Sequence, residues 1–444
     1  MNSLNLLIQG IDFIMAWPLM IYVVVISCIA TVAFGFVQFR SFIPGLKSMF
    51  ASDAEASSSN ADMSPFQAFI NTLSVSLGNG SVAGMGVAVY TGGPGAVFWV
   101  LVFGILVMSV RFAEVYLSTL YGSRYKGKGA LGGPMLYFKD VIFGKYFSYV
   151  YAILCVFFGL SLGNGTQANS IRLGLEKSLG LPPLVSAVII LFFVAYVVFG
   201  GAARIIKVSD KIVPVKVLLF FVSTFIVLVY HAAAIPLALH TIFIGAFNPA
   251  ALAGGALGFG IQYAIQYGMN IAIMASESGL GTVAILFGAT GSRDPFKTAT
   301  MGMLTTFLSS IVCFILGLCI VASGAWNSGL SSNALTIASF ETVFGISGAF
   351  IVTFLSVTFG VGVLVSYAYI TRCAYLYVTG GRYPFVFALI YCAAAFISAL
   401  MQVSVVWKIG AIANGCLLYI NLFGILYLLP TISAEVRKRV AIGK

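Results

Sequence analysis

Charged residues are scarce in this sequence: aspartate, glutamate, lysine and arginine together make up only 8% of its 444 residues. A soluble globular domain carries about 25%, so this composition excludes one. Only two histidines occur, His231 and His240, and none of the seven cysteines stands in a CxxC pair. We therefore expect no histidine- or cysteine-based metal centre. No nucleophile is paired with a neighbouring base, so the sequence predicts neither an enzyme nor a bound cofactor.

What the sequence has instead is long apolar runs, because 60% of its residues are hydrophobic and its mean hydropathy is +1.06. A helix needs about 20 apolar residues to cross a bilayer. We therefore predict an all-α integral membrane protein with about eleven transmembrane helices in the lipid bilayer. The candidate spans are 13–37, 66–91, 95–121, 146–172, 183–200, 211–231, 255–289, 297–323, 346–377, 383–401 and 405–430.

The basic residues predict the orientation of these spans, because lysine and arginine favour cytoplasmic loops. They gather in every second loop, and we count Lys207, Lys211 and Lys216 there as members of one inner-loop group. The stretches 232–254 and 324–345 contain neither residue type. We predict that the N-terminus lies outside and the C-terminus in the cytoplasm. The net charge of +11 arises from these loops, so it does not indicate nucleic-acid binding.

We expect five segments along the chain. Residues 1–38 form an extra N-terminal transmembrane helix, which stays as an anchor because no basic residue precedes its apolar run. Residues 39–65 form a polar cytoplasmic linker that ends in the run ASDAEASSSNADMSP. The ten remaining spans divide into a first five-helix repeat at 66–231 and a second at 232–430. Residues 431–444 form a basic cytoplasmic tail.

Two of these spans carry glycine-rich stretches, SLGNGSVAGMG at 76–86 and GFGIQYAIQYGMNIAIMASESGLGT at 258–282. Each glycine costs a helix interior about 1 kcal/mol relative to alanine. Broken backbone is tolerated at membrane depth only where protein or a polar cavity surrounds it. Matching breaks in the first span of each half therefore predict a transport site, with half-helix N-termini for an anionic group and unwound carbonyls for a cation. The alternative is close helix packing, since Gly80 and Gly84 form a GxxxG pair.

Several polar residues inside the spans are candidate functional groups. A carboxylate within an apolar segment, such as Glu277, is costly and indicates a function, although it could instead cap the break in its helix. Asn164 and Gln167 are expected to face the cavity, or otherwise to bridge helices. Arg111 and Glu114 lie three residues apart, which predicts a structural pair near the inner surface, with gating as the alternative. We expect both histidines to be interfacial residues without chemistry.

The sequence also resembles the alanine or glycine:cation symporters, the sodium:alanine symporter family. The matching motifs follow one another over nearly the whole chain: GNGSVAGMGVAVYTGGPGAVFWV (78–100), GGPMLYF (132–138), GNGTQANSI (163–171), GGAARIIKVSDKIVP (200–214), SESGLGT (276–282) and VWKIGAIANGCLLYINL (406–422). The resemblance implies a leucine-transporter-like fold with two inverted five-helix repeats, whose first and sixth core helices are broken. It also implies uptake of a small neutral amino acid coupled to sodium, in a prokaryotic inner membrane.

The resemblance assigns site residues and shows departures from the family pattern. The family's amino-acid-binding positions in the first broken helix fall on Ser81 and Gly84, where Ser81 replaces an asparagine. In the eighth core helix, Val361 and Gly362 stand where the family usually has serine and threonine, and Ser366 stands where it has tryptophan. These departures remove side-chain oxygens expected for sodium and reshape the substrate pocket.

Pattern and resemblance together give two sets of expected ligands. The expected substrate-binding residues are Gly80, Ser81, Gly84, Gln167, Ser278, Gly279 and Ser366. The expected cation-binding residues, with sodium as the ion, are Gly80, Ala83 and Gly362. Two alternatives stay open: a carrier that is uncoupled or driven by a proton on Glu277, and a membrane sensor that binds an amino acid without pumping it.

Overall fold

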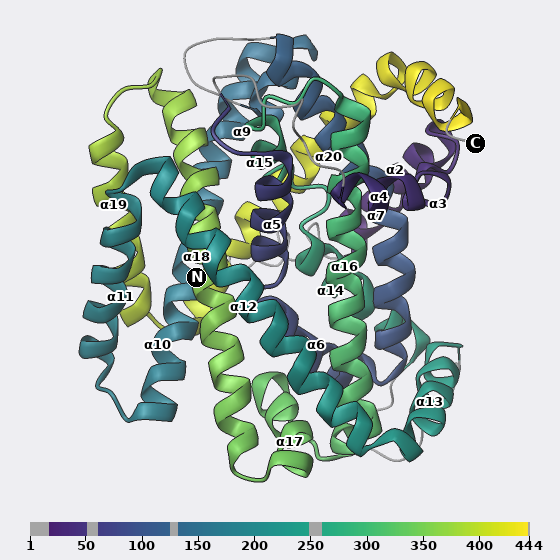
Figure 1. Cartoon of the computed structure of the whole chain (residues 1–444), viewed down its shortest axis with the longest axis vertical. Coiled ribbons are helices and arrows are strands. Elements are labelled where there is room, and N and C mark those ends of the chain that lie inside the picture. Colours follow the sequence, from purple (N-terminus) through teal and green to yellow (C-terminus); the bar gives the residue numbers. More distant parts are fainter. Residues whose placement is uncertain (1–16, 51–60, 125–131, 248–259, 443–444) are drawn as a thin grey trace, which may run out of the picture.

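The computed structural model describes residues 17–50, 61–124, 132–247 and 260–442, and every regular element in these ranges is a helix (Figure 1). The all-α prediction is therefore confirmed for the described part of the chain. The first helices are α2 (Trp17–Ala33), α3 (Val37–Arg40) and α4 (Phe42–Phe50). Helix α2 packs on α7 and α20 through buried residues such as Val23, Ile26 and Ala30, whose spacing places them on one helix face.

In the described ranges, sixteen α-helices follow this N-terminal group, and twelve of them form the body of the molecule. They are α5 (Pro65–Ser76), α6 (Asn79–Gly92), α7 (Gly95–Arg124), α9 (Gly144–Phe158), α10 (Thr166–Leu179), α11 (Pro183–Val198), α12 (Gly201–Tyr230), α14 (Ile261–Ser276), α16 (Pro295–Ala322), α18 (Ser347–Thr379), α19 (Pro384–Leu400) and α20 (Val403–Ile442). The other four helices connect them: α8 (Pro134–Tyr137), α13 (Ile235–Phe247), α15 (Ala284–Gly288) and α17 (Ser332–Phe344).

The first predicted break is present, but it lies a few residues earlier than expected. Helix α5 begins in a capping box, in which Ser64 and Gln67 bond each other's backbone, and it ends at Ser76. The axis then turns by 41° before α6 begins at Asn79. Because Gly80 and Gly84 follow this turn, they lie inside α6 and are not unwound. The expectation of open backbone at 80–84 is therefore wrong.

The second break separates α14 from α15 over residues 277–283. Glu277 closes α14 in the left-handed conformation, with φ of 54°, and its amide donates to the carbonyl of Ile273. The span expected at 255–289 begins outside the described residues. A π-helical turn, Gly159–Gly165, also joins α9 to α10 within one continuous helical run.

By length and composition, six of the described helices could each cross a membrane, and the bent pair α5–α6 would make a seventh. The apolar helices α2, α11 and α19 are shorter, with 16 or 17 residues. The count of eleven spans and the inverted repeat therefore stay predictions.

Two of the expected segments look different in the structure. The expected linker at 39–65 contains helix α4, while its residues 51–60 lie outside the described part. The expected tail at 431–444 continues α20 as far as Ile442, and Arg437 donates to the carbonyls of Val32 and Ala33 at the end of α2.

Candidate functional site

A small cavity of about 60 Å³ lies at the junction between the α5/α6 break and the end of α14. Its walls come from α5, α6, the π turn, α9, α10, α14, α18 and α20. The lining residues are Val75, Ser76, Gly78, Gly80, Ser81, Phe158, Leu162, Thr166, Gln167, Met274, Ala275, Glu277, Leu280, Val363, Tyr367 and Asn414. The two broken helices thus contribute to one cavity, as the sequence predicts.

Four of the predicted residues meet at this cavity: Gly80, Ser81, Gln167 and Glu277. Gly80 has open space where a Cβ atom would stand, so any side chain there would enter the cavity. The hydroxyl of Ser81 donates to the carbonyl of Ser76 across the break, 3.1 Å away, and ties α6 to the end of α5.

Glu277 is the acidic side chain of the cavity wall, and it is held by two hydroxyl groups. Tyr367 on α18 donates a hydrogen bond to its carboxylate, and so does Thr282, at 3.1 Å. The side chain is only 8% exposed. These bonds orient the carboxylate. Glu277 both ends helix α14 and lines the cavity, so its position agrees with a structural role at the break and with a functional role beside the cavity.

The amide of Gln167 also lines the cavity and bonds locally. It donates to the carbonyl of Leu162 and the hydroxyl of Thr166, and it accepts from Asn79 on α6 at 3.4 Å. Asn164 does not line the cavity but bridges two helices, the alternative that the sequence leaves open. Its side-chain amide donates to the carbonyl of Tyr391 on α19 at 2.8 Å.

A larger cavity of about 660 Å³ continues from the small one. The two share wall residues Gly80, Leu162, Met274 and Asn414. The larger cavity runs along α6 to Ser332 at the start of α17, and the expected residues Ala83 and Gly84 line it. In Figure 1, α17 lies at the opposite end of the molecule from α15 and the C-terminus, so the larger cavity extends from the break toward the end of the molecule that carries α17.

Three expected substrate ligands lie elsewhere. The hydroxyl of Ser278 pairs with Thr306 at 3.0 Å, and the carbonyl of Gly279 accepts from Asn421. The hydroxyl of Ser366 pairs with Ser209 on α12 at 3.2 Å. None of the three lines either cavity. Local sequence could not show this, because their partners lie at least 28 positions away along the chain.

The predicted cation set does not come together either. Gly80 and Ala83 lie in α6, where the carbonyls of a helix accept the amides four residues on. Gly362 lies on α18, against Ser74 and the ammonium of Lys216. Lys216 itself is no inner-loop residue, because it is fully buried inside α12. Sequence reasoning thus missed Lys216 as well as two wall residues, Tyr367 and Asn414.

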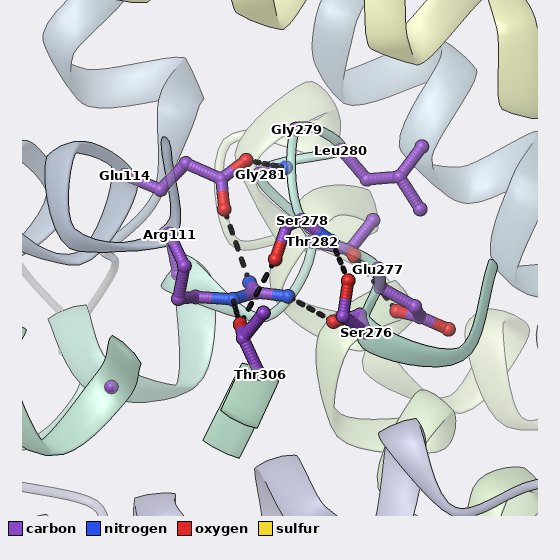
Figure 2. A network of polar contacts seen from close by, with 12 residues as sticks. Arg111, Glu114, Ser276, Glu277, Ser278, Gly279, Leu280, Gly281, Thr282 and Thr306 are labelled. Carbon is purple, nitrogen blue, oxygen red and sulfur yellow. Dashed lines mark hydrogen bonds and ion pairs between the residues drawn. The ribbon is translucent and has the colours of Figure 1, made fainter. Parts of the chain in front are cut away.

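A second polar network holds the α14/α15 break from behind, and Figure 2 shows its centre. Arg111 and Glu114 on α7 form an ion pair of 3.1 Å that is fully buried. Arg111 donates to the carbonyl of Ser276, while Glu114 accepts from the amide of Gly281 at 2.7 Å. Asn421 on α20 bonds Glu114 as well, at 2.8 Å. The predicted pair therefore exists, and it fixes both ends of the broken segment.

Neither histidine lines either cavity. His231 bonds Thr342 at 2.8 Å in an exposed position, and His240 is exposed. Among the described residues, no group of three histidine, cysteine, aspartate or glutamate side chains could hold a metal ion.

Comparisons with known proteins agree with this architecture. The chain is 30% identical to an uncharacterised transporter of Haemophilus influenzae, over 98% of this chain and 96% of that protein. It is 29% identical to the sodium/alanine symporter AgcS of Methanococcus maripaludis, over 92% and 90% of the two chains. Among solved structures, a Na⁺-coupled sialic acid symporter has the same fold, with a TM-score of 0.52 and 10% identity over 93% of this chain and 86% of that one.

These relatives are transporters, as the membrane helices and the absence of an enzymatic motif predict. A model of the sodium:alanine symporter family matches residues 1–441. The chain therefore belongs to the sodium:alanine symporter family.

Proposed function

We propose that the protein is a secondary carrier that imports a small neutral amino acid, of the alanine and glycine class, with a cation through alternating access. Membership of the family supports cation-coupled amino-acid transport. The finer proposal rests on the small cavity, where two broken helices present opposite ends to one space. The leucine-transporter-like repeat, with the bundle of the broken helices moving against the rest, belongs to the same proposal.

Opposite helix ends suit the two charges of an amino acid. The N-terminus of α6 begins at Asn79, and the amides of Asn79 and Gly80 precede the first intrahelical bond, which the Ser81 amide makes to the carbonyl of Gly78 at 3.0 Å. Such an end favours a carboxylate. The C-terminus of α14 reaches the same cavity at Glu277, and both its carbonyl dipole and the carboxylate side chain favour an ammonium group. A zwitterion whose carboxylate lies at α6 and whose ammonium lies at α14 satisfies both ends.

The cavity size supports a small side chain. A cavity of 60 Å³ has room for roughly four to six water-sized groups. Glycine and alanine fall in this range. Phe158, Leu162 and Met274 close the remaining walls with apolar atoms, which favours a neutral side chain over a charged one.

Uptake of radiolabelled alanine into proteoliposomes tests this proposal, with unlabelled glycine, leucine and glutamate as competitors. We expect glycine to compete strongly and the two larger amino acids weakly. Gly80→Leu would fill the open space at Gly80 and should abolish uptake. Gly180→Asn, in the exposed left-handed cap of α10, is the matched control and should transport normally. Equal transport by both variants would exclude this cavity as the substrate site.

A membrane sensor is the second candidate, and the same preparation distinguishes it. A sensor would bind alanine with the same competitors but would never accumulate it against a gradient. Accumulation by the wild type, lost in Gly80→Leu, would rule out the sensor.

Sodium bound at the carbonyls of Gly80 and Ala83 is not part of this proposal, because both residues lie in a regular helix. The open carbonyls at the break are those of Ser74 and Leu77 at the end of α5, and the Nζ atom of Lys216 already donates to them.

A further inference from the structure

Lys216 is a lysine whose ammonium ends inside the helix bundle. Its Nζ atom donates to the carbonyl of Ser74 at 2.8 Å and to the carbonyl of Leu77 at 3.0 Å. The hydroxyl of Ser74 lies 3.4 Å away, and the ring of Phe359 on α18 lies 5.3 Å from Nζ. The side chain has no exposed surface. The ammonium therefore occupies the C-terminal carbonyls of α5, the end of a helix that attracts a cation.

Gly362 explains why the ammonium fits there. A Cβ atom at this position would stand 2.5 Å from Nζ and 2.8 Å from the hydroxyl of Ser74. Any larger residue would therefore displace the ammonium. Neither Val361 nor Gly362 has a side-chain oxygen that could bind a metal cation. Glycine at 362 leaves the space that the amine of Lys216 fills.

We propose that the ammonium of Lys216 takes the place of a bound metal cation at the end of α5, and that its proton is the ion moved together with the substrate. This inference rests on the proposed carrier function and names its coupling ion. The proton binds the Nζ atom from the outer side and leaves it to the inner side. No other bond is made or broken, and one positive charge crosses with each cycle.

The break between α5 and α6 connects this proton to the substrate cavity. Ser76 and Gly78 line the cavity, while the carbonyl of the residue between them, Leu77, accepts from Lys216. On α18, Gly362 faces the ammonium and the next residue, Val363, lines the cavity. The protonated amine therefore holds α5 in place beside the cavity. The neutral amine has lost the charge that strengthens these hydrogen bonds, so α5 is released when the proton leaves.

Another charged group could share the proton of Lys216 if it lay close enough to the ammonium. Among the residues that the structure describes, Nζ bonds the carbonyls of Ser74 and Leu77 and the hydroxyl of Ser74, and it lies near the ring of Phe359 on α18. Helices α11, α16 and α17 also pack against α12. The charged residues of all these neighbours are Lys297 on α16, Glu341 on α17 and Arg372 on α18. On α12 itself, Asp210 accepts from Gln67 at 2.8 Å. Within the described ranges, Lys216 forms an ion pair with none of them.

The test compares alanine uptake into sodium-free proteoliposomes with and without an inward proton gradient. We expect the gradient to raise the initial rate of the wild type at least fivefold, and added sodium to leave it unchanged. Lys216→Gln keeps hydrogen-bond donors for the carbonyls but has no proton to release, so its ratio of rates should fall to one. Lys211→Gln, at an exposed position of the same helix, should keep the wild-type ratio. A wild type that accumulates alanine only with sodium, or a Lys216→Gln variant that still responds to the proton gradient, overturns the proposal.

A second measurement does not depend on the substrate. The melting temperature of the purified protein follows the difference in bound protons between the folded and unfolded states. We expect the pH dependence of the melting temperature between about pH 6 and 9 to differ between the wild type and Lys216→Gln. Lys211→Gln should show the same pH dependence as the wild type. Identical curves for all three proteins would overturn the proposal. If none transports alanine but the curves differ as expected, the proposed substrate is wrong and the titrating lysine stands.

Discussion

Arg111 and Glu114 form an ion pair one turn apart on α7 in which neither side chain has exposed surface. Buried pairs of this kind give little net stability, but removal of one partner leaves an uncompensated charge. Here both partners also bond the backbone of the α14/α15 break, at Ser276 and Gly281. The pair therefore sets the shape of the segment that carries Glu277 into the cavity.

Glu114→Ala should lower the free energy of unfolding by about 3 to 5 kcal/mol, because it leaves the Arg111 guanidinium buried without its partner. Thermal unfolding of the protein in detergent measures the loss. Arg172 and Glu176 provide the control, since this pair is partly exposed. Glu176→Ala should cost less than about 1 kcal/mol. A similar decrease in the free energy of unfolding in both variants would mean that burial of the ion pair does not determine the size of the effect.

Asn421→Leu tests whether this network acts on transport as well as on stability. Asn421 donates to both Glu114 and the carbonyl of Gly279, each at 2.8 Å, and its side-chain oxygen accepts from the hydroxyl of Tyr137. Leucine therefore removes the partner of the Gly279 carbonyl and of the Tyr137 hydroxyl, while Glu114 keeps the amide of Gly281. We expect a loss of about 1 to 3 kcal/mol in stability and a higher KM for alanine, because the break can shift relative to the cavity. Asn164→Leu removes a bond to the carbonyl of Tyr391 elsewhere and should leave KM unchanged. An equal rise in KM for both would show a general loss of packing.

Some of this architecture could be predicted from residues 76–86 and 258–282 alone. Glycine weakens a helix wherever it stands, so both stretches indicated a break in the backbone. The break in the first stretch lies at Gly78, because that glycine packs against Val363, where a Cβ atom would stand 2.8 Å from a methyl group. Such a contact between distant helices leaves no local pattern.

Lys216 shows the limit of local patterns most clearly. It stands near the start of an apolar run, where a lysine ordinarily marks a cytoplasmic loop. Only the packing of α12 against α5 and α18 buries it. Ser278 and Ser366 illustrate the reverse error, since hydroxyls near a predicted site had their partners on other helices. Glu277 could be recognised because a carboxylate in an apolar segment is unusual whatever surrounds it.

Glu277→Gln distinguishes the carboxylate of the cavity from the proposed proton carrier. If Glu277 binds the substrate ammonium, the loss of its charge should weaken alanine binding by about 2 to 5 kcal/mol, which raises KM at least thirtyfold. Stimulation by a proton gradient should remain at saturating alanine, because Lys216 carries the proton. Tyr367→Phe keeps the charge and removes one hydrogen bond, so its KM should rise only about fivefold. A Glu277→Gln variant that transports well but ignores the proton gradient would assign the proton to Glu277.

Gly362→Ala tests the space that holds the ammonium. A Cβ atom at this position would stand 2.5 Å from Nζ of Lys216, so the lysine must leave the carbonyls of Ser74 and Leu77. We expect a loss of stability of about 2 kcal/mol or more, as for a buried polar group that loses its partners, together with slow uptake. In a Lys216→Ala background the clash is absent, and the same substitution should cost less than about 0.5 kcal/mol. Residues in contact couple in such a double-mutant cycle, whereas additive losses would mean that Gly362 is required for the packing of α18 and has no relation to the ammonium.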